Sequence, residues 1–373
     1  MAGIYIHIPF CKQACRYCDF HFSTNTTLLD ELIEMIGKEI TLRAEYLKGL
    51  PIQTLYFGGG TPSLLHPRWI EFLMRKIQET FALDLKEVTL EANPDDLSEE
   101  KLIAWKTLGI DRLSLGIQSF DEAVLQFYHR AHSAAESHRA IEKARNAGFS
   151  KFSMDLIYGF PSSSHALWEK DLNLALAQNP GHLSCYGLTV EPKTALGNWT
   201  EKGKFSPASD EFMAEQFELM QNLTEQAGYE QYEISNFALP GHRSIHNTSY
   251  WLGKPYLGLG PGAHSFDGEH RGANPRNNPS YIRSLQKNQI PLEREILTET
   301  DRLNDYLLTA LRTSWGVDLR WLKNRFGFDL KSERSAVLIQ MEKEGWLLWK
   351  DNTLSLSRSG KLIADSIAEA LFL

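Results

Sequence analysis

Three cysteines within a stretch of eight residues are the side chains in this sequence best suited to binding a metal. Cys11, Cys15 and Cys18 lie in the segment CKQACRYC, whereas the fourth cysteine, Cys185, stands alone far along the chain. A secreted disulfide framework spreads its cysteines along the sequence, so this clustering indicates a metal site in a reducing compartment. Structural zinc takes four protein ligands, but three thiolates hold three corners of a 4Fe–4S cluster and leave one iron open.

Two other interpretations of the cysteines stay open at this point. His7 or His21 would complete a zinc site, and buried structural cysteines would need no metal at all. Thiolate sulfur is the ligand type that suits iron–sulfur clusters, and reactivity usually decides why a cysteine is kept. We therefore predict a 4Fe–4S cluster.

The residues around the cysteines extend this prediction through a resemblance. The pattern CxxxCxxC, with the aromatic residue Tyr17 before its last cysteine, resembles the signature of the radical S-adenosylmethionine (SAM) superfamily. Within it, the segments YIHIPFC and CDF resemble the coproporphyrinogen dehydrogenase/HemW group, and the resemblance extends over nearly the whole chain. It implies that the open iron binds the amino and carboxylate groups of SAM, and that reduction cleaves SAM to methionine and a 5′-deoxyadenosyl radical.

Residues at the ends of the predicted strands are the next candidates for binding a ligand. The segment FGGGTP follows a predicted strand, and its glycines allow the backbone to approach a ligand closely, although such a segment is also a good turn. In a barrel, the site is built at the C-terminal ends of several strands, where polar residues recur in this sequence. By resemblance, Arg130 binds the SAM carboxylate, Asp155 suits the ribose hydroxyls and Glu91 accepts hydrogen bonds from SAM. The predicted SAM-binding residues are Tyr5, Gly59, Gly60, Thr61, Glu91, Gln118, Arg130, Asp155 and Thr189.

A second motif, HNTSYW, begins at His246. Taken alone, it would be a polar turn that leads into an aromatic core contact. The resemblance gives another interpretation, because an HNxxYW segment is characteristic of the HemW-type haem chaperones. Haem iron takes His, Cys, Met or Tyr ligands, so His246 is the first candidate ligand, and Tyr250 and His264 are weaker ones. The glycine-rich run LGLGPGAH at 257–264 has no clear strand before it and is predicted to be a structured loop.

The elements that must position these residues alternate between strand and helix. Alternating units imply parallel strands with right-handed crossovers, and six units predict an α/β fold with a partial TIM-like (β/α)6 barrel. A doubly wound sheet is the competing topology. The predicted strands are 3–8, 53–57, 87–91, 112–116, 151–157 and 182–189, and the predicted helices are 28–47, 68–81, 98–108, 121–128 with 134–147, and 165–177.

Three regions follow from this pattern. Residues 1–230 are predicted to form the barrel, which includes a last helix at 210–227. Residues 231–294 are Gly-, Pro- and Asn-rich and are predicted to be an irregular covering segment. Residues 295–373 are predicted to form a small, mostly helical, winged-helix-like domain. This domain has no basic stripe, so partner contact is favoured over nucleic-acid binding.

Composition excludes several classes of protein. The chain has 373 residues, of which 42% are hydrophobic and 23% charged, so wholesale disorder is excluded. Its 39 basic and 47 acidic side chains give a net charge of −8, which argues against broad binding to nucleic acid or anionic membranes. No apolar run approaches the roughly 20 residues of a membrane span, and no signal peptide is visible, so we expect a cytoplasmic protein without an integral membrane segment.

Three functions are compatible with these features. We favour a haem chaperone that hands haem to an acceptor protein, for which a respiratory protein is one candidate. The alternative is an oxygen-independent coproporphyrinogen III dehydrogenase, but such enzymes carry a fourth cysteine where this chain has Phe20, and an N-terminal extension before the first strand. A radical SAM modifier of RNA has only the shape of the C-terminal domain in its favour.

Overall fold

Six stretches rich in aliphatic residues form the centre of one sheet in the computed structural model, which describes residues 2–373. The strands are β1 (Ala2–Ile8), β2 (Ile52–Gly59), β3 (Leu83–Ala92), β4 (Arg112–Gln118), β5 (Lys151–Tyr158) and β6 (Gly181–Gly187). The helices that follow them are α1 (Leu29–Leu42), α2 (Pro67–Thr80), α3 (Glu99–Thr107), α4 (Glu122–Tyr128), α5 (Ala134–Asn146) and α6 (Ala166–Ala177). Neighbouring strands of this set all pair in parallel.

The order of these strands decides the topology. They are neighbours in chain order from β1 to β6, so every crossover advances in the same direction. A doubly wound sheet would reverse at a switch point, so that alternative is wrong and the partial (β/α)6 barrel is confirmed. The barrel is open, because β1 and β6 pair on their outer sides with later strands and not with each other.

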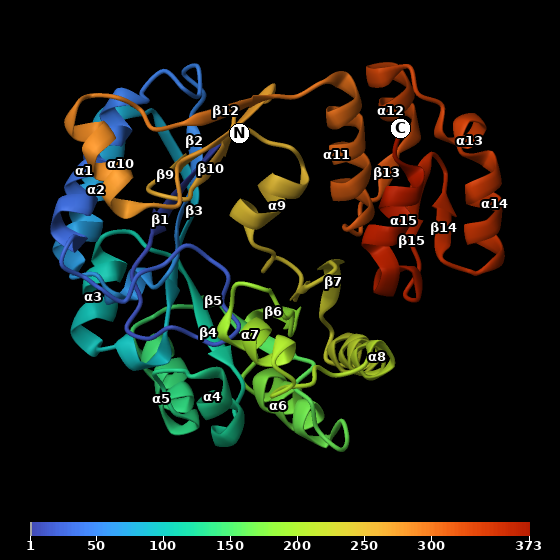
Figure 1. Ribbon diagram of the computed structural model, residues 1–373, viewed down its shortest axis with the longest axis horizontal. Coiled ribbons are helices and arrows are strands. Elements are labelled where there is room, and N and C mark those ends of the chain that lie inside the picture. The colour runs from blue at the N-terminus through green and yellow to red at the C-terminus, as the bar shows by residue number, and fades with distance from the viewer. Residues whose placement is uncertain (1) are drawn as a thin grey trace.

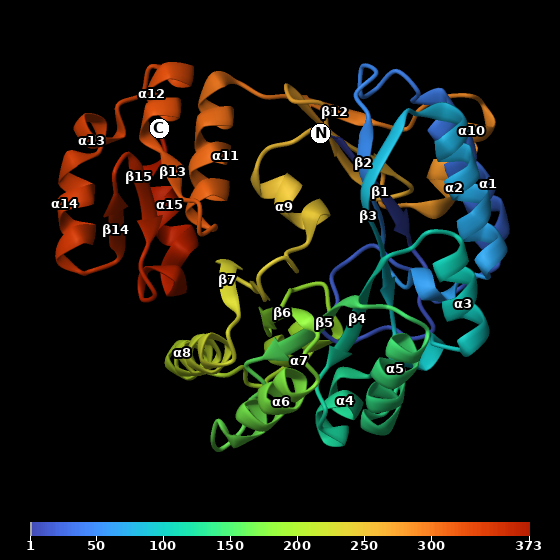
Figure 2. The same cartoon turned by 180° about the vertical axis from the view of Figure 1, so that it is seen from behind.

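The two faces of the sheet differ in polarity. Ile4, Ile6 and Ile8 of β1 are fully buried in the core that the sheet shares with the helices, while Tyr5 and His7 face the other way. The covering helices lie along the outer side of the curved sheet, and a short helix, α9 (Ile245–Trp251), lies on its inner side (Figures 1 and 2). Inward positions in closed barrels are mostly filled by bulky apolar side chains, so the polar residues on the inner face of this sheet indicate a lumen that binds a ligand.

Residues 231–294 are more regular than the sequence predicted. They contain α9, α10 (Asn278–Gln286) and short strands that extend both edges of the sheet, where β9 pairs in parallel with β1 and β8 pairs antiparallel with β6. The glycine-rich run 257–264 is likewise not a loop throughout, because its first three residues belong to β9. The added strands are β7 (Glu230–Glu233), β8 (Asn236–Ala238), β9 (Tyr256–Leu259), β10 (His264–Phe266), β11 (His270–Ala273) and β12 (Glu293–Ile296).

The C-terminal residues form a separate small domain with its own core, in which Leu307, Leu322 and Leu354 are fully buried. Its three-stranded sheet has the order β13-β15-β14 and packs with helices, as a winged-helix-like domain requires. Its elements are α11 (Glu299–Leu311), β13 (Val317–Asp318), α12 (Leu319–Phe326), α13 (Leu330–Glu333), α14 (Ser335–Lys343), β14 (Leu347–Lys350), β15 (Thr353–Leu356) and α15 (Ala364–Leu371). Two further helices follow β6 along the chain, α7 (Ala195–Glu201) and α8 (Asp210–Gln226), the latter close to its predicted bounds.

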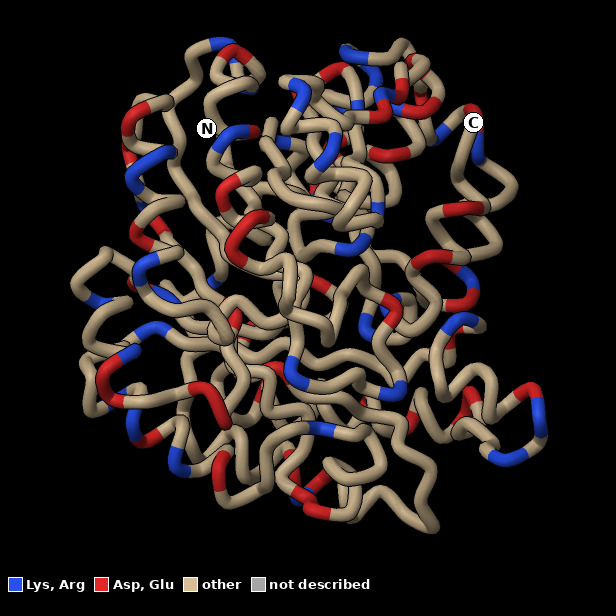
Figure 3. The backbone as a smooth tube through the Cα atoms, turned by 60° about the vertical axis from the view of Figure 1, so that its left-hand side comes forward, with Lys and Arg blue, Asp and Glu red and all other residues tan. Residues whose placement is uncertain are grey.

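Charge is distributed without large single-sign regions along the chain. Figure 3 shows acidic and basic residues interspersed over the barrel helices and over the C-terminal domain. No helix within residues 2–373 combines the length and the apolar character that crossing a membrane requires.

Candidate functional site

One cavity of about 710 Å³ runs through the barrel lumen from the cysteine segment to α9. Its walls are the inward faces of the central strands. Every predicted SAM-binding residue lines it, as do the three clustered cysteines and the two residues His246 and Tyr250. The structure therefore brings together nearly the whole set of residues that the sequence singled out.

The cysteines lie on a loop that follows β1 and folds back on itself. Cys11 N donates to the carbonyl of Ser23 at 3.1 Å, and Ser23 N donates to that of Pro9 at 2.8 Å, which closes the loop. Two polar groups approach the sulfur atoms from the barrel: Thr61 Oγ1 lies 3.4 Å from Cys11 Sγ, and Arg130 Nη1 lies 3.4 Å from Cys15 Sγ.

The donor set fits an iron–sulfur cluster better than a single ion. Among residues 2–373, no three His, Cys, Asp or Glu side chains converge closely enough to bind one metal ion. A 4Fe–4S cluster needs no such convergence, because each thiolate binds a different iron. Burial raises the pKa of Cys11 and that of Cys18 to about 11, and a metal cation bound to a thiol favours its thiolate form.

The glycines of FGGGTP are required by close packing against this loop. Gly59 has φ +107°, and a Cβ atom on it would lie 2.5 Å from the ring of His7. A Cβ atom on Gly60 would lie 2.8 Å from the backbone of Phe10. The amides of Gly59, Gly60 and Thr61 all donate hydrogen bonds within the protein. The loop can therefore offer carbonyl oxygens to a ligand, and these are the acceptors that an amino group requires.

Glu91 is a half-buried residue near the C-terminal end of β3. Its Oε1 accepts from Tyr56 at 2.8 Å, and its Oε2 accepts from Gly59 N at 3.0 Å. Burial raises its pKa to about 7, and the nearby Asp155 adds to that shift. Tyr5 lies beside this pair, with its ring stacked on Tyr56 at a centroid distance of 5.9 Å.

Asp155 is one of the inward-facing residues of β5. It accepts from Ser114 Oγ at 3.0 Å and from Ser153 Oγ at 3.2 Å. Burial raises its pKa to about 6, although these hydrogen bonds oppose the shift. Its carboxylate therefore stays inside the lumen with acceptor capacity left for a ligand's hydroxyl groups.

Arg130 follows α4 and points back into the lumen. Its guanidinium donates to Asn93 Oδ1 and, at 2.9 Å, to the carbonyl of Gly116, while its buried Nε has no partner. Gln118, at the end of β4, has φ +67° and lines the cavity nearby. Thr189 lies at the exposed rim, because β6 ends at Gly187 and not at 189 as predicted.

His246 lies on α9 at the inner end of the cavity and is only 1% exposed. Its Nδ1 lies 2.7 Å from Thr54 Oγ1 and its Nε2 lies 2.8 Å from the hydroxyl of Tyr250. Its ring also stacks on Tyr56 at 5.0 Å, and burial lowers its pKa to about 3. Both ring nitrogens are thus engaged within the protein. His264 is exposed on β10 and is not among the described residues that line the cavity.

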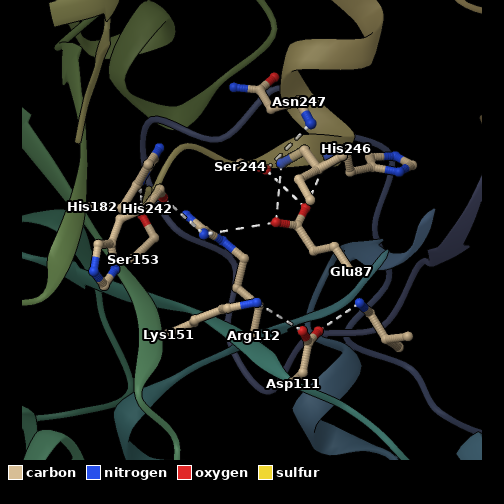
Figure 4. A network of polar contacts seen from close by, with 12 residues as sticks. Glu87, Asp111, Arg112, Lys151, Ser153, His182, His242, Ser244, His246 and Asn247 are labelled. Atoms are coloured by element: carbon tan, nitrogen blue, oxygen red, sulfur yellow. Dashed lines mark hydrogen bonds and ion pairs between the residues drawn. The ribbon is translucent and has the colours of Figure 1, made fainter. Parts of the chain in front are cut away.

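Sequence reasoning missed the floor of the cavity, which Arg112 and His182 line, and the buried Glu87 carboxylate that lies 3.8 Å from Arg112 Nη1 (Figure 4). Glu87 accepts from the backbone amides of Ile245 and His246, so it holds the first turn of α9. The signal was present, because polar residues occupy alternate positions along each strand and not only its end, as in Glu87, Thr89 and Glu91. The same spacing recurs in 112–118 and 182–186.

Comparisons with known proteins find two matching family models and relatives that are similar over nearly the whole chain. The family model described as "Radical SAM superfamily" matches residues 5–175, and "HemN C-terminal domain" matches residues 297–363. "Heme chaperone HemW" of Bacillus subtilis is 34% identical over 98% of each chain. "Heme chaperone HemW" of Mycobacterium tuberculosis is 32% identical over 99% of this chain and 94% of its own.

Among solved structures, that titled "Coproporphyrinogen III oxidase (HemN) from Escherichia coli is a Radical SAM enzyme" superposes with a TM-score of 0.86. The superposition covers 100% of this chain and 90% of that one, at 22% identity. At this identity the similarity concerns the fold, and it includes the C-terminal domain.

Proposed function

Because the chain belongs to the heme chaperone HemW family, we propose that it binds haem and passes it to an acceptor protein, on a scaffold that holds a 4Fe–4S cluster and SAM. The observation that carries this proposal is that a single cavity joins the three cysteines at one end to the HNxxYW segment at the other. Iron–sulfur ligands and a candidate haem ligand therefore face the same enclosed space.

In this proposal, Cys11, Cys15 and Cys18 hold the cluster. When bound, a reduced cluster would supply one-electron cleavage of SAM to methionine and a 5′-deoxyadenosyl radical. Arg130 is suited to the SAM carboxylate, since its guanidinium is buried beside Cys15 and its Nε still lacks an acceptor. The carbonyls of the Gly59–Thr61 turn suit the amino group.

The remaining SAM-binding roles fall to the lumen walls. Asp155 accepts hydrogen bonds from ribose hydroxyls, and Glu91 accepts from SAM while Tyr56 and Gly59 hold it in place. Tyr5 covers the inner side, Gln118 adds an amide, and Thr189 closes the exposed rim.

Haem ligation by His246 requires a local exchange of hydrogen bonds. The imidazole is the neutral, coordinating form at physiological pH, because its pKa is about 3. One of its two partners, Thr54 or Tyr250, must release the ring before a nitrogen faces the iron. We propose that α9 moves to allow this, and that Tyr250 then covers the macrocycle.

The same proposal includes the kind of protein that accepts the haem and the compartment in which the chain is located. The chain hands haem to a protein that we expect to be a respiratory or membrane-associated haem protein. We propose the cytoplasm as its location, because three clustered free thiols need a reducing compartment.

The test is anaerobic reconstitution followed by parallel assays of haem binding and of coproporphyrinogen III turnover. We expect a haem absorbance band at stoichiometric haem and no vinyl product. His246→Ala should reduce haem uptake while its iron and sulfide content equals that of the wild type, and His264→Ala serves as the matched control. Vinyl product would favour the dehydrogenase, and a wild-type protein without a haem band would overturn the proposal.

A further inference from the structure

The floor of the cavity contains a buried arginine that the proposed SAM and haem contacts do not use. Arg112 begins β4, and its side chain is 3% exposed. Its Nη1 donates to the carbonyl of His242 at 3.1 Å and lies 3.8 Å from Glu87 Oε2. Its Nη2 is buried and has no hydrogen-bond partner (Figure 4). A guanidinium edge buried in this way is costly unless an acceptor meets it.

A second donor without a partner lies directly beside it. Thr89 is 1% exposed, and its Oγ1 also lacks a hydrogen-bond partner. Thr89 and Arg112 are paired residues in the register of β3 and β4, so their side chains leave the same face of the sheet next to each other. Both residues line the cavity.

Two polar neighbours of Arg112, Glu87 and His182, are committed elsewhere. Glu87 Oε1 accepts from Ser244 Oγ and His246 N, and its Oε2 accepts from Ile245 N, so this carboxylate is drawn toward α9. His182 engages both ring nitrogens, with Ser153 and with Tyr232, each at 2.7 Å. Neither side chain can turn to Arg112 Nη2 without losing these bonds.

Two adjacent donors, one of them cationic, match the two oxygens of a carboxylate. We propose that Thr89 and Arg112 form a carboxylate-binding subsite at the cavity floor, and that it takes a propionate side chain of the haem. This inference rests on the proposed function. The subsite adjoins the HNxxYW segment, because Glu87 contacts both Arg112 and the amide of His246. The SAM carboxylate is assigned to Arg130, whose contacts lie at the cysteine end of the cavity.

The experiment compares iron protoporphyrin IX with its dimethyl ester, whose propionates cannot accept as carboxylates. Both are titrated anaerobically into the reconstituted full-length protein and followed by absorbance. The wild type should bind the free acid at least about tenfold more tightly than the ester, as expected for a charge-assisted hydrogen bond. The double variant Glu87→Gln/Arg112→Gln removes both charges of the buried pair together and should lose this preference.

Thr89→Val removes only the hydroxyl and should reduce the preference by a few fold, with exposed Thr107→Val as its matched control. Circular dichroism and iron content verify folding of each variant. A wild type that binds acid and ester equally, or a double variant that keeps the full preference, would overturn the subsite while the haem proposal stands. A variant that loses SAM affinity and keeps the preference would assign the carboxylate to SAM. If the wild type binds neither porphyrin, the proposed function itself fails.

Discussion

At the scale of single residues, the lumen is marked by two carboxyl groups whose pKa values are raised. Glu91 and Asp155 face the same cavity from β3 and β5, and burial raises the pKa of each. Hydrogen bonds from Tyr56 and from Ser114 oppose these shifts without cancelling them. The two carboxyls therefore titrate near neutral pH, where a ligand that donates hydrogen bonds would favour their charged forms.

The shift at Glu91 predicts a pH-dependent stability. Its pKa rises from 4.5 to about 7 in the folded protein, so between these values the unfolded chain releases a proton that the folded protein keeps. The free energy of unfolding therefore falls as pH rises through this window. Glu91→Gln removes the effect, and from pH 5 to pH 8 the variant should gain roughly 1–3 kcal/mol relative to wild type, since one pKa unit is about 1.4 kcal/mol.

Denaturant unfolding of both proteins at the two pH values measures this difference. Glu142→Gln, at an exposed helix position, is the control and should follow the wild type. If the difference in the free energy of unfolding between wild type and Glu91→Gln is the same at both pH values, Glu91 is ionised in the folded state throughout.

The cysteines carry a second prediction at this scale. Cys11→Ala, Cys15→Ala and Cys18→Ala should each abolish the brown 4Fe–4S form, because three thiolates are the minimum that leaves one open iron. Cys185→Ala should keep it, since Cys185 is 1% exposed in the core outside the lumen. Iron and sulfide analysis after anaerobic reconstitution checks this, and a Cys11→Ala protein with full iron and sulfide would contradict it.

At the scale of elements, α9 is a short helix held by partners far away in the sequence. Ser244 caps it locally by accepting from Asn247 N, and Glu87 accepts from two amides of its first turn. Its inner face rests on β2 through His246, which contacts Thr54 and stacks on Tyr56. A helix of seven residues is marginal on its own, so these contacts decide its position.

Loosening α9 at one of these contacts should affect haem uptake. Thr54→Val keeps the shape of the side chain but removes the hydrogen bond to His246 Nδ1, at a cost of about 1 kcal/mol. If His246 ligates haem, its release becomes easier and haem association should be several-fold faster in stopped-flow absorbance. Thr41→Val on the surface of α1 is the control. Unchanged association in Thr54→Val, together with unchanged affinity in His246→Ala, would exclude His246 as the ligand.

At the scale of the whole molecule, the C-terminal domain reaches the cavity wall through Arg312. Its Nη2 donates to Glu233 at 3.2 Å, where the Glu233 side chain is 1% exposed. Glu233 accepts from Asn236, which lines the cavity. The Arg312 guanidinium also lies over the ring of Trp251, the last residue of α9, at 5.5 Å. The domain is therefore positioned to restrain α9.

Removing the Arg312 side chain should loosen β7 and α9, the two elements that it contacts. Arg312→Ala leaves the buried Glu233 carboxylate without its cation and should lower the free energy of unfolding by about 1–3 kcal/mol. Hydrogen exchange of the β7 and α9 amides should become faster. Arg325→Ala breaks an exposed ion pair with Glu299 and should cost less than about 1 kcal/mol. Equal exchange of α9 in Arg312→Ala and wild type would show that the domain does not restrain this helix.

Much of the fold and the cysteine end of the site could be read from the sequence, because the signals there are local. Each strand–helix unit carries its own periodicity, and parallel strands bring their C-terminal ends to one edge, so Glu91, Gln118 and Asp155 had to meet. The spacing of three cysteines on one loop needs no distant partner. The strand order was left between two topologies, since periodicity does not say which strands are neighbours.

Residues 231–294 and the cavity floor were decided by tertiary structure. Strands such as β9 have four residues, too few for a periodic signal, and β9 finds its place by pairing with β1 at the other end of the chain. The position of His246 depends on Glu87, which lies 159 residues earlier, and the environment of Arg112 depends on which strand lies beside it. Burial, and with it the pKa and free hydrogen-bonding capacity of each side chain, is set by such long-range neighbours. The sequence determined which groups could do the chemistry, and only the packed sheet determined which of them share one cavity.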